Sequence, residues 1–394
     1  MWKKFRHKVV CAILRPFFTL YFKIKYKCSF DKAIKTEAGA LVISNHVTTL
    51  DPFLVSLLFK EPVYHMMSKD ILMHRFTGKI IQYLVNPIPK EKSKSTDITA
   101  IKNCLKVAKE NGIINIFVEG NRTLSGELCF VDESIVKLAK LLKKPLYIIN
   151  IEGGYHSDPR WSNTIRKGKV TVRRRKVIEY DEIKQMSDSE IYKIIIENLN
   201  VDNYSSDTKF KGKKLAEHLE RVFYICPVCG SYHTINTNDN YINCSNCGLS
   251  VEYSENFKFI SNKDEFKFKH INEWYNYQID TIKGKTYDDN DIIYQDNVGV
   301  YIPRVYQKKE DLGIANMVLY NDRFEFVFEN NKIILNFDSI DAVTLVGKKK
   351  MNIYTKENTY QVFYGLKLNL LKYMHMFYLI KNRKDGVNNE FLGL

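Results

Sequence analysis

The sequence lacks any run of about 18 uninterrupted apolar residues, which is the length that a transmembrane helix needs. Residues 9–22 come nearest, but Arg15 and Pro16 interrupt them and no small-residue cleavage site follows. The sequence therefore predicts neither a clean transmembrane helix nor a signal peptide.

Cysteine usage excludes a disulfide framework. Four of the eight cysteines form two Cys-x-x-Cys pairs, Cys226/Cys229 and Cys244/Cys247, which is typical of a reducing compartment and a metal site. Fourteen residues separate the pairs, enough for a short hairpin, and a glycine follows each second cysteine. Four thiolates at this spacing suit tetrahedral Zn²⁺ with no open position, so we expect a structural zinc in a unit that resembles a zinc ribbon, with His233 outside the ligand set. A redox role for the pairs is the alternative.

The chain of 394 residues is long enough for two or three domains with their own cores. Lys and Arg outnumber Asp and Glu by 60 to 45, and the net charge of +15 favours an anionic partner: a membrane surface, a nucleic acid or a phosphorylated substrate. Residues 230–243, between the cysteine pairs, contain no Lys or Arg. That absence disfavours nucleic-acid binding by the ribbon.

The first 35 residues carry ten Lys or Arg and a single acid, Asp31. Apolar residues recur between these charges at roughly helical spacing: Trp2, Phe5, Val9, Ile13, Phe17, Leu20, Tyr21 and Ile24. Such a basic, aromatic-rich amphipathic helix is typical of a membrane-surface anchor. The alternative is a helix that covers the domain that follows, and the two are compatible.

A histidine and an aspartate follow the apolar strand 40–43, ahead of an apolar helix over 52–59. A carboxylate beside a histidine holds the imidazole in one tautomer and stabilises its charged form, which suits a general base. His46 and Asp51 are five positions apart, about 500° of helix, so they meet only if His46 lies in the turn before the helix. The alternative is that Asp51 simply starts the helix as its N-cap and His46 is an ordinary loop residue.

Strands and helices alternate from here to about residue 200, which predicts an α/β domain with a largely parallel sheet. The apolar strand 113–118 ends in Glu119-Gly120-Asn121-Arg122. The carboxyl end of such a strand is where α/β sheets place ligands. There Arg122 could grip a phosphate, Glu119 could orient Arg122, and Gly120 lets backbone approach closely. The alternative is a turn with a surface Glu–Arg pair.

Together these motifs resemble the glycerolipid acyltransferase family, especially the 1-acylglycerol-3-phosphate acyltransferases. Its His-x4-Asp motif stands here as Asn45-His46-Val47-Thr48-Thr49-Leu50-Asp51-Pro52. Its Phe-Pro-Glu-Gly-Thr-Arg-Ser motif stands as Phe117-Val118-Glu119-Gly120-Asn121-Arg122-Thr123, where Val118 and Asn121 depart from the pattern. Lys90 loosely matches the basic residue of another family block. The resemblance covers about residues 35–200.

The resemblance implies the roles of the motif residues. His46 would take the proton from a free glycerol hydroxyl, whose oxygen attacks the acyl donor, and Asp51 would orient the imidazole. Arg122, with Lys90, would hold the phosphate of a lysophosphatidate-type acceptor, and Glu119 and Gly120 belong to the same binding motif. The donor would be an acyl-carrier-protein or coenzyme A thioester, or an acyl phosphate, and the product phosphatidate. No catalytic cofactor is implied, and we expect a peripheral or monotopic protein at the cytoplasmic face of the cell membrane.

The second half turns to β structure after a helix expected over 263–282. Seven short strands follow between 299 and 364, and then a final helix over 368–380. This order resembles a pleckstrin-homology-like or GRAM-like domain. Lys348-Lys349-Lys350, at a strand turn, is either a solvated loop or a contact for anionic lipid headgroups.

The sequence thus predicts five segments. They are an amphipathic membrane-surface helix over 1–35, an acyltransferase domain over 36–205, a zinc ribbon over 220–255, a helical linker over 256–293 and an antiparallel β domain closed by a helix over 294–385. The competing hypothesis is an acyltransferase-fold lipid-binding or adaptor protein that acts through its ribbon and β domain. The intact His46/Asp51 and Glu119/Arg122 sets favour the enzyme.

Overall fold

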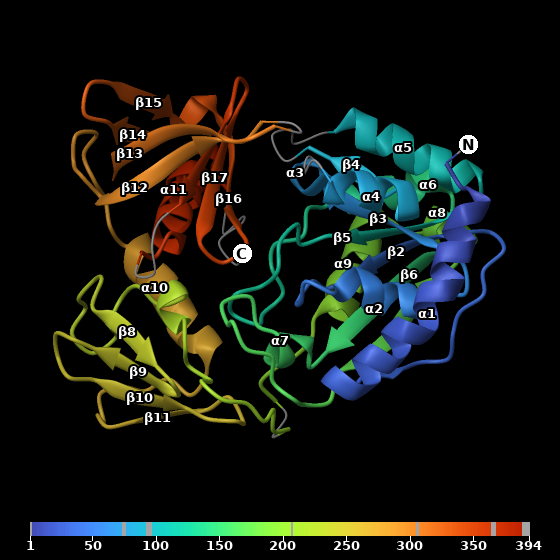
Figure 1. Cartoon of the computed structure of the whole chain (residues 1–394), viewed down its shortest axis with the longest axis horizontal. Coiled ribbons are helices and arrows are strands. Elements are labelled where there is room, and N and C mark those ends of the chain that lie inside the picture. Colours follow the sequence, from blue (N-terminus) through green and yellow to red (C-terminus); the bar gives the residue numbers. More distant parts are fainter. Residues whose placement is uncertain are drawn as a thin grey trace.

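The computed structural model describes residues 2–72, 76–91, 97–205, 208–304, 307–363 and 368–387. Figure 1 shows an α/β domain beside two smaller β-rich units, with helix α10 (Ile271–Lys283) between those two units. Val305 and Tyr364, near the ends of two expected strands, lie outside the described residues.

The α/β domain is built on one sheet of seven described strands, ordered β1-β7-β6-β2-β5-β3-β4. They are β1 (Ser29–Phe30), β2 (Ala40–Ser44), β3 (Val63–Ser68), β4 (Ile88–Lys90), β5 (Ile113–Phe117), β6 (Leu146–Glu152) and β7 (Thr171–Ile178). Neighbouring strands run parallel except β6 and β7, which run antiparallel. The expectation of a mostly parallel sheet is confirmed.

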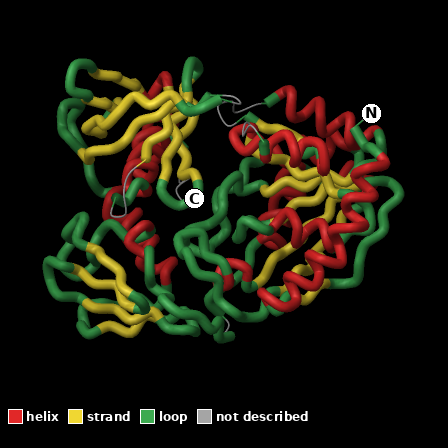
Figure 2. The backbone as a smooth tube through the Cα atoms, in the orientation of Figure 1, coloured by secondary structure: helices red, strands yellow, loops and turns green. Residues whose placement is uncertain are grey.

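Helices cover both faces of this sheet (Figure 2). They are α1 (Phe5–Tyr26), α2 (Asp51–Leu57), α3 (Lys69–Leu72), α4 (Thr77–Val85), α5 (Ile98–Lys109), α6 (Ser134–Leu142), α7 (Gly154–Ser157), α8 (Tyr180–Gln185) and α9 (Asp188–Leu199). Successive side chains of a strand point to opposite faces, so β2 serves two cores. Leu41 and Ile43 join the core beneath α5, α6 and α9, whereas Val42 packs in the core that contains Phe22 of α1 and Leu54 of α2.

The first β-rich unit contains four described antiparallel strands: β8 (Ile235–Asn238), β9 (Tyr241–Cys244), β10 (Ser250–Tyr253) and β11 (Phe259–Ser261), preceded by the short 3-10 helix η1 (Leu219–Arg221). Strands β8 and β9 form the hairpin expected between the cysteine pairs. The helix expected from residue 263 begins only at Ile271, so that prediction was wrong at its start. Phe266 instead packs edge-on against Phe259 and Trp274, which takes residues 263–270 out of a helical path.

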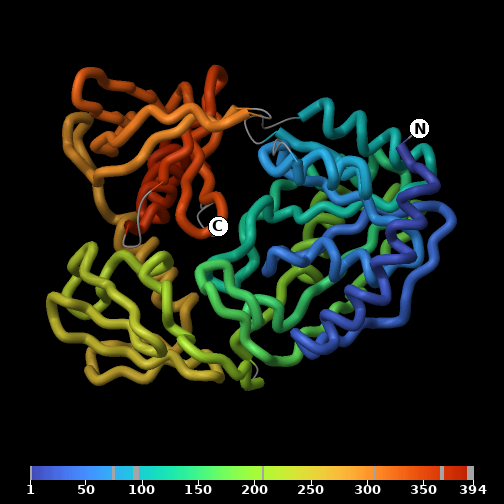
Figure 3. Tube along the Cα trace, viewed as in Figure 1, coloured from blue at the N-terminus to red at the C-terminus, as the bar shows by residue number. Residues whose placement is uncertain are grey.

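The second β-rich unit, called the β domain here, has seven described strands and a closing helix. The elements are β12 (Tyr294–Ile302), β13 (Glu310–Leu319), β14 (Arg323–Val327), β15 (Lys332–Asn336), the 3-10 helix η2 (Phe337–Ser339), β16 (Ile340–Val346), β17 (Lys350–Thr355), β18 (Thr359–Phe363) and α11 (Leu371–Asp385). All its paired strands run antiparallel, in the order β15-β14-β13-β12-β18-β17-β16. The expected antiparallel sheet with one final helix is confirmed. In Figure 3, α1 lies on the side of the α/β domain away from the β domain.

Candidate active site

His46 lies in the turn between β2 and α2. Its Nδ1 is 2.8 Å from Oδ2 of Asp51, the first residue of α2. The prediction that the two meet across the turn before the helix is confirmed. With Nδ1–H donated to the carboxylate, Nε2 is the nitrogen left to accept a proton, which is the tautomer that a general base needs.

The carboxylate of Asp51 is fully buried and organises the turn that carries His46. Oδ2 also accepts the backbone N–H groups of Val47 and Thr48, at 2.6 and 2.9 Å, and Oδ1 accepts the Thr48 hydroxyl at 2.6 Å. Leu50, not Asp51, is the N-cap of α2. The simple N-cap alternative is therefore wrong, because the carboxylate binds residues that precede the helix.

Burial and nearby charges keep the imidazole of His46 neutral. Burial lowers the pKa of His46 below 6.5, and the hydrogen bond and charge of Asp51 oppose that shift. Arg122 and Arg160 lower the pKa further. The ring of Phe117 also stacks on the imidazole, with centroids 4.3 Å apart. At neutral pH His46 is thus in the basic form.

Glu119 follows β5, the neighbour of β2, and connects the two motifs. Its Oε1 accepts the backbone N–H of His46 at 2.7 Å, and its Oε2 accepts that of Cys129 at 3.0 Å. Burial raises the pKa of Glu119 to about 7, which these N–H donors oppose because they stabilise the carboxylate. Glu119 therefore holds the backbone on two sides of the site. The sequence had instead suggested that Glu119 orients Arg122.

Arg122 and Gly120 lie in the turn that follows Glu119; residues 119–123 are called the Arg122 turn below. Gly120 is exposed and has φ +69°, a conformation that suits glycine. Burial lowers the pKa of Arg122, and the charges of Asp158 and Asp51 oppose this. Thr123 N–H donates to the carbonyl of His46 at 3.2 Å. The guanidinium thus lies within electrostatic range of the His46–Asp51 pair.

Lys90 is the predicted site residue that lies farthest out in the sheet order. It ends the edge strand β4, which β3 separates from β5. Its side chain is exposed, and no contact among the described residues joins it to His46 or Arg122. The structure brings His46, Asp51, Glu119, Gly120 and Arg122 together and leaves Lys90 apart from them.

Two site residues were missed at the sequence level. The amide of Asn45 bonds both to the carbonyl of Ile151, at 3.1 Å, and to its N–H, at 2.8 Å, which fastens the end of β2 to β6. Arg160, after α7, donates to the carbonyl of Arg122 at 2.9 Å. No short motif in the sequence marks Arg160, which follows β6 and α7.

Residues 25–152 match the Acyltransferase family model. These residues form an acyltransferase-family domain. The resemblance that the two motifs carry is confirmed for this acyltransferase domain. A 1-acyl-sn-glycerol-3-phosphate acyltransferase from Cocos nucifera is 23% identical over 148 residues. That alignment covers 37% of this chain and 48% of the relative, so the chain spans about half of the relative's length.

A solved structure of similar outline is the crystal structure of the 1-acyl-sn-glycerophosphate (LPA) acyltransferase PlsC from Thermotoga maritima. It aligns over 49% of this chain and 79% of that chain, with 17% sequence identity and a TM-score of 0.41.

The four paired cysteines form a cluster outside the acyltransferase domain. The sulfurs of Cys226, Cys229, Cys244 and Cys247 all lie within 4.8 Å of one another. The Cys226–Cys247 and Cys229–Cys244 sulfur distances are 3.7 and 3.8 Å. A tetrahedral ion with metal–sulfur bonds of about 2.3 Å needs sulfurs roughly 3.8 Å apart, so the four thiols fit one such ion.

Helix α1 presents most of its apolar residues to solvent. This apolar stripe comprises Phe5, Val9, Ile13, Phe17, Leu20, Tyr21 and Ile24, which are between 38% and 80% exposed. Phe22 and Tyr26 instead bury α1 against the acyltransferase domain. Among the described helices, none has the length and apolar character that a membrane crossing requires.

Proposed function

We propose that the protein is a membrane-associated acyltransferase that acylates 1-acylglycerol 3-phosphate to phosphatidate. The 2.8 Å contact between His46 Nδ1 and Asp51, beside Arg122, carries this proposal. It supplies a neutral base next to a cation within one acyltransferase-family domain. That combination suits an acceptor that has both a hydroxyl group and a phosphate.

The proposed reaction is a direct transfer. Nε2 of His46 takes the proton of the free glycerol hydroxyl as its oxygen attacks the carbonyl carbon of the acyl donor. The tetrahedral intermediate then expels the donor's thiolate, or phosphate if the donor is an acyl phosphate, and His46 returns the proton to it. Asp51 stabilises the imidazolium that forms in between. The donor is proposed to be an acyl-carrier-protein or coenzyme A thioester, and no catalytic cofactor takes part.

Arg122 is proposed to bind the acceptor phosphate through its planar guanidinium. Glu119 supports this site indirectly, since it holds the backbone of His46. Gly120 leaves the turn open, because nothing lies within 4 Å of where its Cβ would be. Lys90 has a weaker claim, since it ends a strand that is not adjacent to β2 or β5.

The other parts have supporting roles in this proposal. The thiol cluster holds structural Zn²⁺, since four sulfur ligands leave no position for substrate. The apolar stripe of α1, with the Lys and Arg residues around it, rests on an anionic membrane surface at the cytoplasmic face. The lysophosphatidate acceptor would then reach the site from the membrane plane.

Acyl transfer by the purified full-length protein tests this function. Lysophosphatidate would be offered with three acyl donors: an acyl-carrier-protein thioester, a coenzyme A thioester and an acyl phosphate. Wild type would be compared with His46→Ala and Arg122→Ala. We expect phosphatidate from wild type, a loss of about 10²–10⁴-fold for His46→Ala, and a raised acceptor KM for Arg122→Ala. No product with any donor, despite lysophosphatidate binding, would favour the lipid-binding or adaptor alternative.

A further inference from the structure

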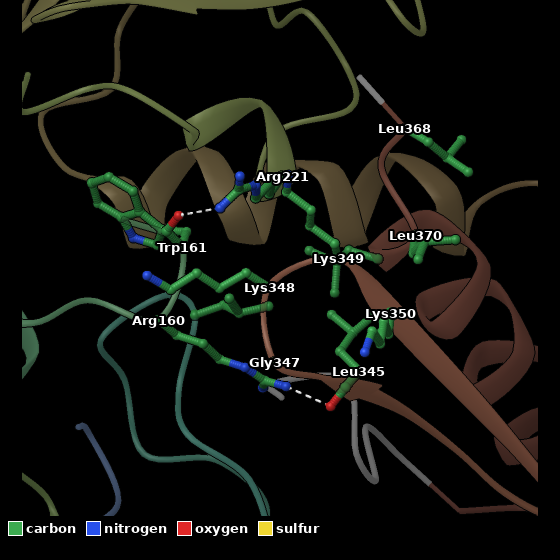
Figure 4. A pocket seen from close by; sticks show the side chains of 12 residues that line it. Arg160, Trp161, Arg221, Leu345, Gly347, Lys348, Lys349, Lys350, Leu368 and Leu370 are labelled. Carbon is green, nitrogen blue, oxygen red and sulfur yellow. Dashed lines mark hydrogen bonds between the residues drawn. The ribbon is translucent and has the colours of Figure 1, made fainter. Parts of the chain in front are cut away.

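Arg160 connects the α/β domain to the β domain. Its side chain is only 4% exposed. Nη1 donates to the carbonyl of Arg122 at 2.9 Å, and Nη2 donates to the carbonyl of Leu345, near the end of β16, at 2.7 Å. Figure 4 shows the second of these bonds, with Arg160 reaching from its loop to the β16 strand end. One buried guanidinium therefore fastens the Arg122 turn to the β domain.

The burial of Arg160 has an energetic cost that its contacts must offset. Burial lowers the pKa of Arg160 to about 10, and the charge of Arg122 lowers it too. Its hydrogen-bond partners among the described residues are carbonyls, not a carboxylate. A buried charge without an acid partner adds little stability, so what the guanidinium contributes is the geometry that it enforces on the two chain segments.

The next turn of the β domain reinforces this connection. Lys348, between β16 and β17, donates to the carbonyl of Ser162 and to Oδ1 of Asn163, the latter at 3.2 Å. Lys348 is nevertheless exposed, so these contacts leave open both interpretations of the Lys348–Lys350 run, a solvated loop and a contact for anionic lipid headgroups. Burial lowers the pKa of Lys348, and the charge of Asp158 opposes this.

Asp158 lies in the field of cations from both domains. Burial raises its pKa, and Arg122 and then Lys348 act against that shift. Arg122 and Lys348 thus both act on one acid, and two cations so placed suit a phosphate monoester. Lys348 of the β domain therefore lies within electrostatic range of Arg122.

We propose that Arg160 is a positioning residue that sets the Arg122 turn for the acceptor phosphate by anchoring it to β16. The inference rests on the proposed acceptor, since it concerns how the phosphate of lysophosphatidate is bound. It makes the β domain a part of acceptor recognition, with Lys348 as a second anchor between the domains.

The test measures lysophosphatidate binding by calorimetry and the acceptor KM, on full-length protein. Arg160→Met should weaken binding and raise the acceptor KM about tenfold or more, because hydrogen bonds of a charged group are lost, while kcat and the donor KM change little. Arg160→Lys should recover part of the loss. Arg221→Met is the matched control, because Arg221 lines the same pocket and donates to the carbonyl of Trp161 at 2.9 Å, but makes no hydrogen bond to the Arg122 turn among the described residues.

A double variant separates positioning from general stability. If Arg160 acts through Arg122, then Arg160→Met should add almost nothing to the binding loss already caused by Arg122→Met. Additive losses, or equal losses in Arg160→Met and Arg221→Met, would overturn the inference. Should Arg160→Met fail to fold, Lys348→Met tests the same connection from the β domain and should raise the acceptor KM several-fold.

The outcomes distinguish this inference from the proposed function. Phosphatidate formation with unchanged acceptor binding in Arg160→Met and Lys348→Met would refute the inference alone. Binding that weakens in Arg160→Met, in a wild-type protein that makes no phosphatidate, would support the inference and refute the function. A folded wild type that binds no lysophosphatidate would refute both.

Discussion

The backbone N–H of His46 donates a 2.7 Å hydrogen bond to Oε1 of Glu119. This bond joins two motifs that stand 73 residues apart in the sequence. Because Oε2 of Glu119 is bound to the N–H of Cys129, the carboxylate also fixes the loop on the other side. The turn that presents the imidazole is therefore tied to the turn that follows β5 and, through the same carboxylate, to the loop that contains Cys129.

The protonation of Glu119 should make stability depend on pH. Its pKa is raised from 4.5 to about 7 in the folded protein, mainly by burial. The folded state therefore binds this proton more tightly, so the stability gained is complete below about pH 4.5 and is lost as pH rises through about 7. In urea titrations at pH 4.5 and 7.5, wild type should lose about 3 kcal/mol more unfolding free energy than Glu119→Gln. If the unfolding free energies of wild type and Glu119→Gln changed equally with pH, the raised pKa of Glu119 would be contradicted.

The pH profile of acyl transfer should reflect His46. Burial lowers its pKa below 6.5, so the basic form persists into mildly acidic solution and kcat/KM should fall with an apparent pKa below 6.5. Asp51→Asn removes the charge that raises the pKa of His46. Its acid limb should therefore move to still lower pH, while the maximal rate drops. If the acid limb of the kcat/KM profile moved to higher pH in Asp51→Asn, the proposed pairing of His46 with Asp51 would be ruled out.

The sequence could predict contacts between residues that lie close together in the chain. The His46–Asp51 contact followed from a five-residue spacing, and the hairpin between the cysteine pairs followed from their separation. Arg160 was out of reach, because its partners are carbonyls 38 and 185 positions away and any residue type supplies a carbonyl. The role of Glu119 was missed for a similar reason, since a backbone N–H leaves no mark in the sequence.

Metal loss should destabilise the unit that contains the thiol cluster. We expect about one zinc per chain by elemental analysis, and a strong chelator should lower the unfolding temperature. Cys244→Ser should lose the metal, whereas Cys11→Ser, a thiol on α1 outside the cluster, should retain it. A folded wild-type protein without metal would eliminate the zinc assignment.

Acidic substitutions in the apolar stripe should weaken membrane binding. Phe17 and Leu20 are both exposed on α1, so Phe17→Glu/Leu20→Glu should leave the fold intact and reduce binding to anionic vesicles at least tenfold, by about 1.5–3 kcal/mol for each side chain no longer buried. Ile314→Glu is the control, because Ile314 is at least as exposed as Phe17 and Leu20 but lies on β13 of the β domain. Equal effects of the two changes in vesicle sedimentation would place the contact elsewhere.

A buried ion pair should make the β domain sensitive to one acid. Lys372 of α11 is buried and donates to Oδ2 of Asp296 at 2.6 Å, and the hydroxyl of Tyr373 donates to the same oxygen. Asp296→Ala leaves the ammonium group without its counter-charge and should cost about 3–5 kcal/mol in urea unfolding. Lys372→Met removes the charge together with its desolvation cost and should be milder. The reverse order would argue against a buried pair.

The bond from Arg160 to Leu345 also has a consequence for synthesis, because it spans 185 residues of chain. Ribosomes add about 5–20 residues per second, so Leu345 is joined roughly 10–40 s after Arg160. During that interval the strands of the acyltransferase domain can pair, yet the Arg122 turn has no anchor on β16. A nascent chain would therefore carry a folded sheet before the proposed phosphate site is anchored, and activity should appear only after β16 has been synthesised.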